Sequence, residues 1–354
     1  MLRLRFAQLL GFLIGVFVTF LLVPHFAFAG PKPDILQLKR QEISLSSRPV
    51  SFSKASDTKK IFGRLIYRGG FKVYSSSAFW GGLSGIALSN NGTHGVAVSD
   101  AGFWTRFDLS YDKAGQLKPL KRAMVGPIKA LKNRPLKRGR DRDAEAITLV
   151  KAKQFFSHAY ISFEQNHRVG RFVIGKEGVV GPKSYLKMSS ITQRLSGNAG
   201  LEALSVLRGG KLKGALVAIA QSRKDAKGNF IGWLLHKGKV RKLRFVPPKL
   251  DKYRITDAVS LPNGDLVLLE RRYKFFKINI RLRLVKQKEL RRGKPIAGQI
   301  LMEANSSEHR VDNMEGLAVH TNKRGKTILT LLSDDNFNSF QETLFMQFLL
   351  PPTH

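Results

Sequence analysis

The chain has 354 residues, of which 43% are hydrophobic, enough for a large core in one or two domains. It contains no cysteine, which excludes disulfides, thiolate metal sites and a cysteine nucleophile. Its formal charge of +36 attracts anions of every kind, from phosphate esters to nucleic acid, anionic lipid and acidic glycans.

Residues 1–29 have the layout of a secretory signal peptide. Two arginines precede an apolar run over residues 9–23, and an Ala-Phe-Ala processing site ends at Ala29. We therefore expect cleavage after Ala29 and a periplasmic or secreted protein. An uncleaved membrane anchor stays open as the alternative, because about 15–20 apolar residues can just span a bilayer.

Two further regions precede the main pattern of the chain. Residues 30–60 combine Pro, Ser and Lys with weak periodicity, which predicts a linker. Ile61–Val73 has the β-rich, alternating composition of a strand pair or an edge strand. We expect one domain over residues 61–354.

The rest of the chain repeats a unit of short strands. Each copy starts with an apolar strand, continues with a second strand that ends in an acid in four of the five copies, and adds a third strand. Aligned positions in the first strands are Ser84, Glu145, Glu202, Asp257 and Glu315, at steps of 61, 57, 55 and 58 residues. Repeats of this length with little helical periodicity predict an all-β fold, a β-propeller with one blade per repeat.

The repeat count predicts five blades, or six if the N-terminal stretch builds more of a blade. The strand expected over Thr343–Leu350 lies after the last repeat, and Ile61–Val73 lies before the first. We expect these N- and C-terminal strands to share one blade, because that arrangement closes the ring and covers exposed strand edges.

Acidic residues recur at equivalent points although the chain has only 25 of them against 61 Lys and Arg. Near the first strand they are Glu145, Glu202, Asp257 and Glu315, and at the end of the second Asp100, Glu164, Glu270 and Asp334. Carboxylates that converge on a propeller axis repel one another unless something neutralises them. Their use in turns and ion pairs with neighbouring arginines is the alternative.

Oxygen-only ligands suit a hard cation, Ca²⁺ or Mg²⁺, which can hold a phosphate and polarise its oxygen. The residues that we expect to hold it are Glu145, Glu202, Glu315, Asp334 and Asp335. Asp335 has no acidic counterpart in the other copies, which makes the last copy the preferred carrier of chemistry. We assign no catalytic residue, because the chain shows no nucleophile elbow, P-loop, zinc motif or dinucleotide fingerprint.

Basic residues provide candidate contacts to an anion. We expect Arg168, Arg271 and Arg272 to hold an anionic substrate, because guanidinium matches phosphate geometry. Two basic stretches, residues 118–142 and 271–294, could contact an anionic membrane surface or another envelope component. Nucleic acid is disfavoured, because these stretches lack an aromatic stacking platform. In the second stretch charges alternate with Ile and Leu, which predicts a strand with one solvated face.

Several motifs occur together in one order. They are Gly81-Gly82-Leu83-Ser84-Gly85-Ile86, Asp143-Ala144-Glu145-Ala146, Leu269-Glu270-Arg271-Arg272-Tyr273, Asp312-Asn313-Met314-Glu315-Gly316 and Leu332-Ser333-Asp334-Asp335-Asn336-Phe337. With them, the chain resembles the phytase-like esterase family, which carries the domain called esterase-like activity of phytase, over about residues 63–350.

The resemblance implies an exported bacterial β-propeller that hydrolyses esters, phosphate esters among them. An anionic small-molecule ester is the partner that we then expect at an acidic mouth of the ring. A propeller without catalysis, serving as an interaction scaffold in the periplasm or at the envelope, is the second interpretation, because propellers host many functions.

Overall fold

The structure is a computed structural model that describes residues 30–352, apart from short gaps at 152–154, 189–190, 192–194, 196–199, 249–251, 275–276 and 292. The signal peptide predicted over residues 1–29 lies outside this part of the chain. Within the described residues no helix is both long enough and apolar enough to cross a membrane.

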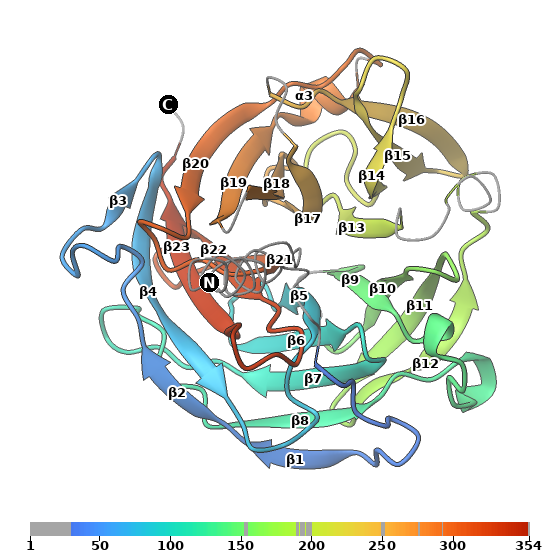
Figure 1. The fold of residues 1–354 in the computed structure, drawn as a ribbon. Coiled ribbons are helices and arrows are strands. Elements are labelled where there is room, and N and C mark those ends of the chain that lie inside the picture. The colour runs from blue at the N-terminus through green and yellow to red at the C-terminus, as the bar shows by residue number, and fades with distance from the viewer. Residues whose placement is uncertain are drawn as a thin grey trace, which may run out of the picture.

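Five antiparallel sheets stand around a central axis as the blades of a propeller (Figure 1). The predicted all-β fold and its five blades are confirmed. Blade 1 contains β5 (Leu83–Leu88), β6 (His94–Ser99), β7 (Phe103–Asp108) and β8 (Arg122–Pro127). Blade 2 contains β9 (Ala144–Leu149), β10 (His158–Phe163), β11 (Arg168–Gly175) and β12 (Gly178–Tyr185). Blade 3 contains β13 (Leu201–Val206), β14 (Leu216–Lys224), β15 (Phe230–His236) and β16 (Lys239–Phe245).

The remaining blades complete the ring. Blade 4 contains β17 (Arg254–Ser260), β18 (Leu266–Lys274), β19 (Lys277–Val285) and β20 (Gln299–Asn305). Blade 5 contains β21 (Met314–Thr321), β22 (Thr327–Ser333), β23 (Leu344–Leu350) and β4 (Leu65–Tyr74), with the short β3 (Ile61–Phe62) beside β4. Among the described residues the helices are short: η1 (Leu131–Asn133), η2 (Gly139–Asp141) and α3 (Gln287–Arg291).

The hydrophobic core lies between blades. Five clusters of buried side chains occur in the described part of the chain, one for each neighbouring pair of blades. The innermost strands β5, β9, β13, β17 and β21 each contact the next one around the axis. Every residue of β5 and of β13 is buried, because both faces of an inner strand pack against neighbouring sheets.

Blade 5 closes the ring with strands from both ends of the described chain. β4 pairs antiparallel with β23, with Phe71 opposite Phe345 and Gly70 opposite Met346. This confirms the predicted closure. Breaking the ring therefore requires separation of a complete strand ladder.

The expectation of a linker over residues 30–60 was wrong for its central part. β1 (Gln41–Ser44) pairs with the outer edge of blade 1 at β8, and β2 (Ser46–Pro49) pairs with the outer edge of blade 5 at β4. Ile43 and Leu45 are buried in the core between these two blades. Residues 41–49 thus form a clasp over the outer edges of both blades.

The expected solvated face of the second basic stretch was also wrong. Arg281 and Arg283 on β19 are 1% and 0% exposed. Glu270 on the adjacent β18 accepts hydrogen bonds from both: its Oε2 lies 2.6 Å from Arg281 Nε, and its Oε1 pairs with Arg283 Nη2. The Arg281 guanidinium also lies 4.0 Å from the ring centre of Tyr253. Two arginines are buried here because one carboxylate and an aromatic ring replace their hydration.

Candidate functional site

The first strand of every blade carries a bulge near its start. In blade 5, Met314 faces Ser333 and Gly316 faces Leu332, so Glu315 is an extra residue without a partner. Blade 3 repeats this geometry around Glu202. The bulged residues are Ser84, Glu202, Thr256 and Glu315 in blades 1, 3, 4 and 5, and in blade 2 Glu145 and Ala146 lie opposite the single residue Ser162. A bulge re-aims one side chain out of the regular alternation of a strand, and here it can turn that side chain toward the axis.

An acidic cavity of about 310 Å³, here called the axial cavity, collects four of these side chains, and Thr256 is not part of its lining. All five blades contribute to its lining. The lining residues are Lys32, Ser84, Asp100, Asp143, Glu145, Glu164, Gln165, Glu202, Gln221, Arg254, Glu315, Asp334 and Asn336. Four of the five residues that we expected to hold a cation, Glu145, Glu202, Glu315 and Asp334, are therefore brought to one cavity.

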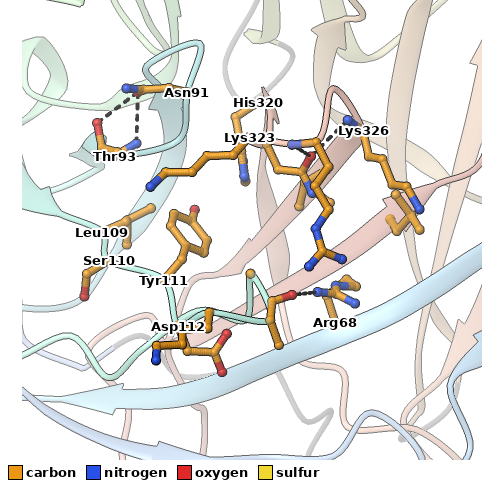
Figure 2. Close-up of a pocket in the computed structure, with 17 residues that line it drawn as sticks. Arg68, Asn91, Thr93, Leu109, Ser110, Tyr111, Asp112, His320, Lys323 and Lys326 are labelled. Carbon is orange, nitrogen blue, oxygen red and sulfur yellow. Dashed lines mark hydrogen bonds between the residues drawn. The ribbon is translucent and has the colours of Figure 1, made fainter.

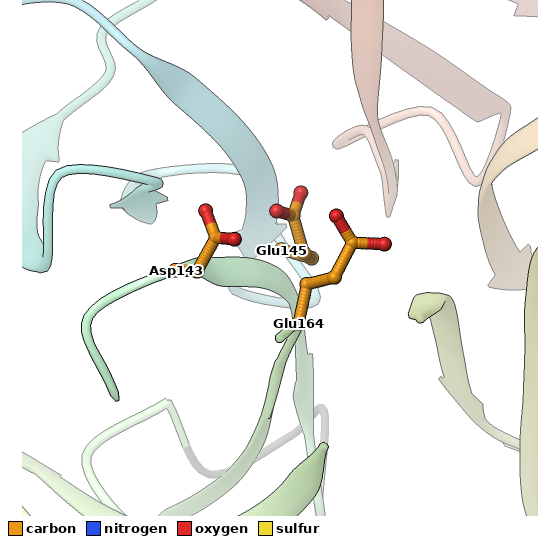
Figure 3. Close-up of side chains that lie close together, drawn as sticks. All are labelled: Asp143, Glu145 and Glu164. Carbon is orange, nitrogen blue, oxygen red and sulfur yellow. The ribbon is translucent and has the colours of Figure 1, made fainter. Parts of the chain in front are cut away.

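Three carboxylates of blade 2 form the tightest group (Figure 3). One oxygen from each of Asp143, Glu145 and Glu164 lies within 4.8 Å of the other two. Ca²⁺ binds oxygens at 2.3–2.6 Å, so two ligands on opposite sides of it stand roughly 5 Å apart. A spacing within this bound is compatible with a hard divalent cation held by oxygen ligands, and it does not choose between Ca²⁺ and Mg²⁺.

The hydrogen bonds of this group leave room for a cation. Glu164 Oε1 accepts from the backbone N–H of Gly200 at 2.8 Å, and Asp143 Oδ2 accepts from Gln165 Nε2 at 2.7 Å. Within the described residues no donor reaches the Glu145 carboxylate. Its pKa is raised well above the ordinary range, first by burial and then by the charges of Glu202 and Asp143. A half-buried, unpaired carboxylate of this kind is stabilised by a bound cation.

Burial has the same effect on other acids of the cavity. It raises the pKa of Asp100 to about 6, although the Lys32 ammonium lies 2.8 Å from Asp100 Oδ2 and opposes the shift. It raises the pKa of Glu164 to about 7. The pKa values of Glu202 and Asp334 lie well above the ordinary range for the same reason. Without a cation the cavity therefore retains protons near neutral pH.

Asp335, the fifth residue expected to hold a cation, does not line the cavity. Its Oδ1 accepts from the backbone N–H groups of Gly82 at 3.1 Å and Phe337 at 3.0 Å, and its Oδ2 accepts from Thr343 Oγ1 at 2.7 Å. It follows Asp334 by one residue and ties the loop after β22 to blade 1. The structure therefore places Asp335 outside the cavity that collects the other four residues expected to hold a cation.

Blade 4 departs from the predicted alignment by one residue. Ile255 faces Glu270 and Asp257 faces Leu269, so the bulged residue is Thr256. Asp257 Oδ2 instead accepts from the backbone N–H of Leu317 at 2.7 Å, in the neighbouring blade. By the same register Arg271, not Glu270, is the counterpart of Asp334. Blade 4 therefore brings neither of its repeat acids to the axis.

The three arginines expected to hold substrate have other partners. Arg271 Nη1 donates to Glu315 Oε1 at 2.6 Å and to Asn313 Oδ1. Arg168 lies 3.9 Å from the ring centre of Phe163 and donates to the carbonyl of Asn166, and Arg272 stacks on Tyr253 at 4.6 Å. None of the three lines the axial cavity. Each of the three therefore has contacts within the protein and lies outside the lining of the axial cavity.

Two cations that line the cavity did not stand out in the sequence. Arg254, at the first residue of β17, is exposed and donates to Gln221 Oε1 at 3.3 Å. Lys32 reaches Asp100 from the segment expected to be a linker. The position of Arg254 at the start of an inner strand could have indicated its role, whereas nothing local distinguishes Lys32 from other lysines.

Comparison with known proteins agrees with this architecture. The family model described as phytase-like, esterase-like activity of phytase, matches residues 78–337, which include inner strands of all five blades. No curated protein matches the chain. The match covers most of the sequence, and the chain belongs to the phytase-like family.

Proposed function

We propose that this protein hydrolyses an anionic ester, with a phosphate ester as the preferred substrate, in the axial cavity. The cluster of Asp143, Glu145 and Glu164 carries the proposal, because it concentrates negative charge at the axis of a chain with an excess of basic residues. Membership of the phytase-like family supports the same class of reaction.

The same three carboxylates would hold a hard divalent cation such as Ca²⁺ or Mg²⁺, because all their ligand atoms are oxygens. When bound, such a cation polarises an ester oxygen and lowers the pKa of a bound water. Glu202 and Asp334 also line the cavity and add negative charge that attracts a cation.

Other lining residues supply functions that a cation does not. Arg254 and Lys32 are the cationic side chains of the cavity and would orient the anionic group of the ester. Asp100 Oδ1 is buried and has no hydrogen-bond partner in the described residues. Since the pKa of Asp100 is raised to about 6, this oxygen suits acceptance of a proton from an attacking water near neutral pH.

The test is hydrolysis of p-nitrophenyl phosphate and p-nitrophenyl acetate before and after removal of cations with a chelator. We expect the chelator to abolish turnover and Ca²⁺ to restore it. Glu145→Gln should reduce kcat/KM about 10–100-fold. Glu308→Gln, an exposed acid outside the cavity, is the matched control and should retain activity. If Glu145→Gln were as active as the wild type, both with and without chelator, the proposed site would be wrong.

We infer that residues 1–29 direct export, because their charge and apolar run have the layout of a signal peptide. Mass spectrometry of the protein isolated from its own cells should give an N-terminus at Gly30. An intact Met1 in the membrane fraction would instead support an uncleaved anchor.

A further inference from the structure

A second cavity, here called the seam pocket, lies at the opposite end of the strands that bear the axial cavity. β5 leads from Ser84 in the axial cavity to the turn around Asn91, roughly 20 Å away for a six-residue strand. β21 likewise leads from Glu315 to the turn that holds Lys323. The seam pocket has a volume of about 460 Å³ and lies between blades 1 and 5.

The lining of the seam pocket is amphiphilic. Its apolar side chains are Leu109, Tyr111, Ile328 and Leu349, and its cationic side chains are Arg68, Lys113, Lys323, Arg324 and Lys326. Figure 2 shows Tyr111 and His320 among the side chains of Arg68, Lys323 and Lys326. Asp112 is the only acid of the lining, and its Oδ1 accepts from the backbone N–H of Gln116 at 2.8 Å.

The cations of the lining lack internal counterions. In the described part of the chain no carboxylate pairs with Lys113, Lys323, Arg324 or Lys326. Arg68 donates one hydrogen bond, from Nη2 to the carbonyl of Ala114 at 2.7 Å. The positive charge is therefore available to a bound anion.

His320 gives the pocket an unused polar group. It is 2% exposed, and its Nδ1 is buried without a hydrogen-bond partner in the described residues. The imidazole is held in place: its ring centre lies 5.6 Å from that of Tyr111, and a Cβ at Gly92 would come within 2.4 Å of it. Burial lowers its pKa to about 4, so the neutral ring offers one donor and one acceptor at pH 7.

We propose that the seam pocket binds a small aromatic anion. Its acidic group, a carboxylate, sulfonate or phosphate, would lie against Lys323, Lys326 and Arg68, and its ring against Tyr111 and Leu109. Its volume falls within the range of small-molecule sites, about 300–1,000 Å³. An inorganic anion would leave the apolar wall uncovered, and a neutral aromatic compound would not use the cations.

The position of the pocket gives binding a structural consequence. Gln347 Nε2 on β23 donates to Tyr111 Oη at 3.2 Å, and the N–H of Thr321 donates to the carbonyl of Asn90 at 2.8 Å. Both bonds join blade 5 to blade 1. A ligand in the pocket touches the same two blades and stabilises the closed ring, which raises the melting temperature.

The experiment is calorimetric titration of the full protein with 1-naphthalenesulfonate, which contains no ester that the axial cavity could hydrolyse. Sulfate and 1-naphthalenemethanol are the comparison compounds. We expect saturable binding of the sulfonate at one site, a rise in melting temperature, and binding at least about 10-fold weaker for both comparison compounds. Chelator treatment should change none of these results. The binding test is therefore independent of the proposed hydrolysis.

Charge reversal at the pocket sharpens the test. The double variant Lys323→Glu and Lys326→Glu should weaken sulfonate binding about 10-fold or more. The matched control reverses Lys239 and Lys242, two exposed lysines of blade 3, and should bind as wild type. Equal weakening by both double variants would show attraction to net charge alone, and sulfate binding as tight as the sulfonate would show a simple anion patch. Either result overturns the proposal.

Discussion

The acids of the repeated strand pattern have a different role in blade 4 than in the other four blades. In blades 1, 2, 3 and 5, acids at the bulge or on the neighbouring strand end line the axial cavity. In blade 4 the register moves the acids one residue away, so Glu270 lies inside the blade against Arg281 and Arg283. A shift of one residue in the strand register therefore decides whether an acid of this repeat lines the cavity or forms ion pairs inside its blade.

The largest effect is expected for Glu270→Gln, which tests the structural role of the blade 4 acid. The change removes the buried carboxylate shared by Arg281 and Arg283 and leaves only the half-exposed Glu303 near Arg281, so we expect the free energy of unfolding to fall by about 3–5 kcal/mol. Urea unfolding measures the loss. Glu303→Gln, which removes a half-exposed partner 3.5 Å from Arg281, should cost less than about 1 kcal/mol. Similar small losses for both variants would mean that Glu270 has no special structural role.

Glu145→Gln should change the response of the protein to Ca²⁺ rather than the stability of the cation-free fold. We expect Ca²⁺ at 100 times its dissociation constant to raise the free energy of unfolding of the wild type by about 2.7 kcal/mol. The variant should lose this gain, because a cluster ligand becomes neutral. Glu270→Gln, despite its lower stability, should still respond to Ca²⁺. A response to Ca²⁺ that survives in Glu145→Gln would contradict the assignment of this cluster.

The cavity acids also predict a pH dependence for protein freed of cations. The pKa values of Asp100 and Glu164, about 6 and about 7 in the folded state, lie above those of the unfolded chain. The folded state thus binds more protons, so its free energy of unfolding falls as pH rises from about 4 to about 7. We expect Glu164→Gln to reduce that fall by an amount on the order of 1 kcal/mol in urea unfolding at several pH values. Parallel curves for the two proteins would exclude Glu164 as a contributor.

Arg271→Lys gives the smallest expected effect. Both hydrogen bonds come from the single atom Nη1, and the lysine side chain keeps the charge but is one bond shorter, so its ammonium lies farther from Glu315 and Asn313. We expect a loss of about 1 kcal/mol in the free energy of unfolding and little change in the response to Ca²⁺. A complete loss of that response would instead place Arg271 in the cation site.

The fold was predictable from local features of the sequence, whereas the residues that line the axial cavity were predictable only in part. Strand periodicity, turn residues and repeat spacing indicate five blades and a shared closing blade, and both occur. The clasp was not predicted, because β2, Ser46–Pro49, lacks the alternation of apolar and polar residues that indicates a strand. Its role depends on the open edges of distant strands, which no local pattern contains.

The errors at the site have one physical origin. Side chains of a strand change face at every residue, so an alignment that places Asp257 beside Glu315 instead of Thr256 reverses the assigned face. Composition cannot fix that step, because the acid Asp257 stands directly after the bulged Thr256 in blade 4. Similarly, charge alternation on β19 suggested exposure, and only the position of Glu270 opposite Arg281 explains why two arginines are buried.

The five bulges have a consequence for engineering. The residues at four of them, Ser84, Glu145, Glu202 and Glu315, line the axial cavity and lie outside the regular pairing of the ladder. A library restricted to these four positions would vary ion preference and substrate charge while the strand pairs that support them stay the same.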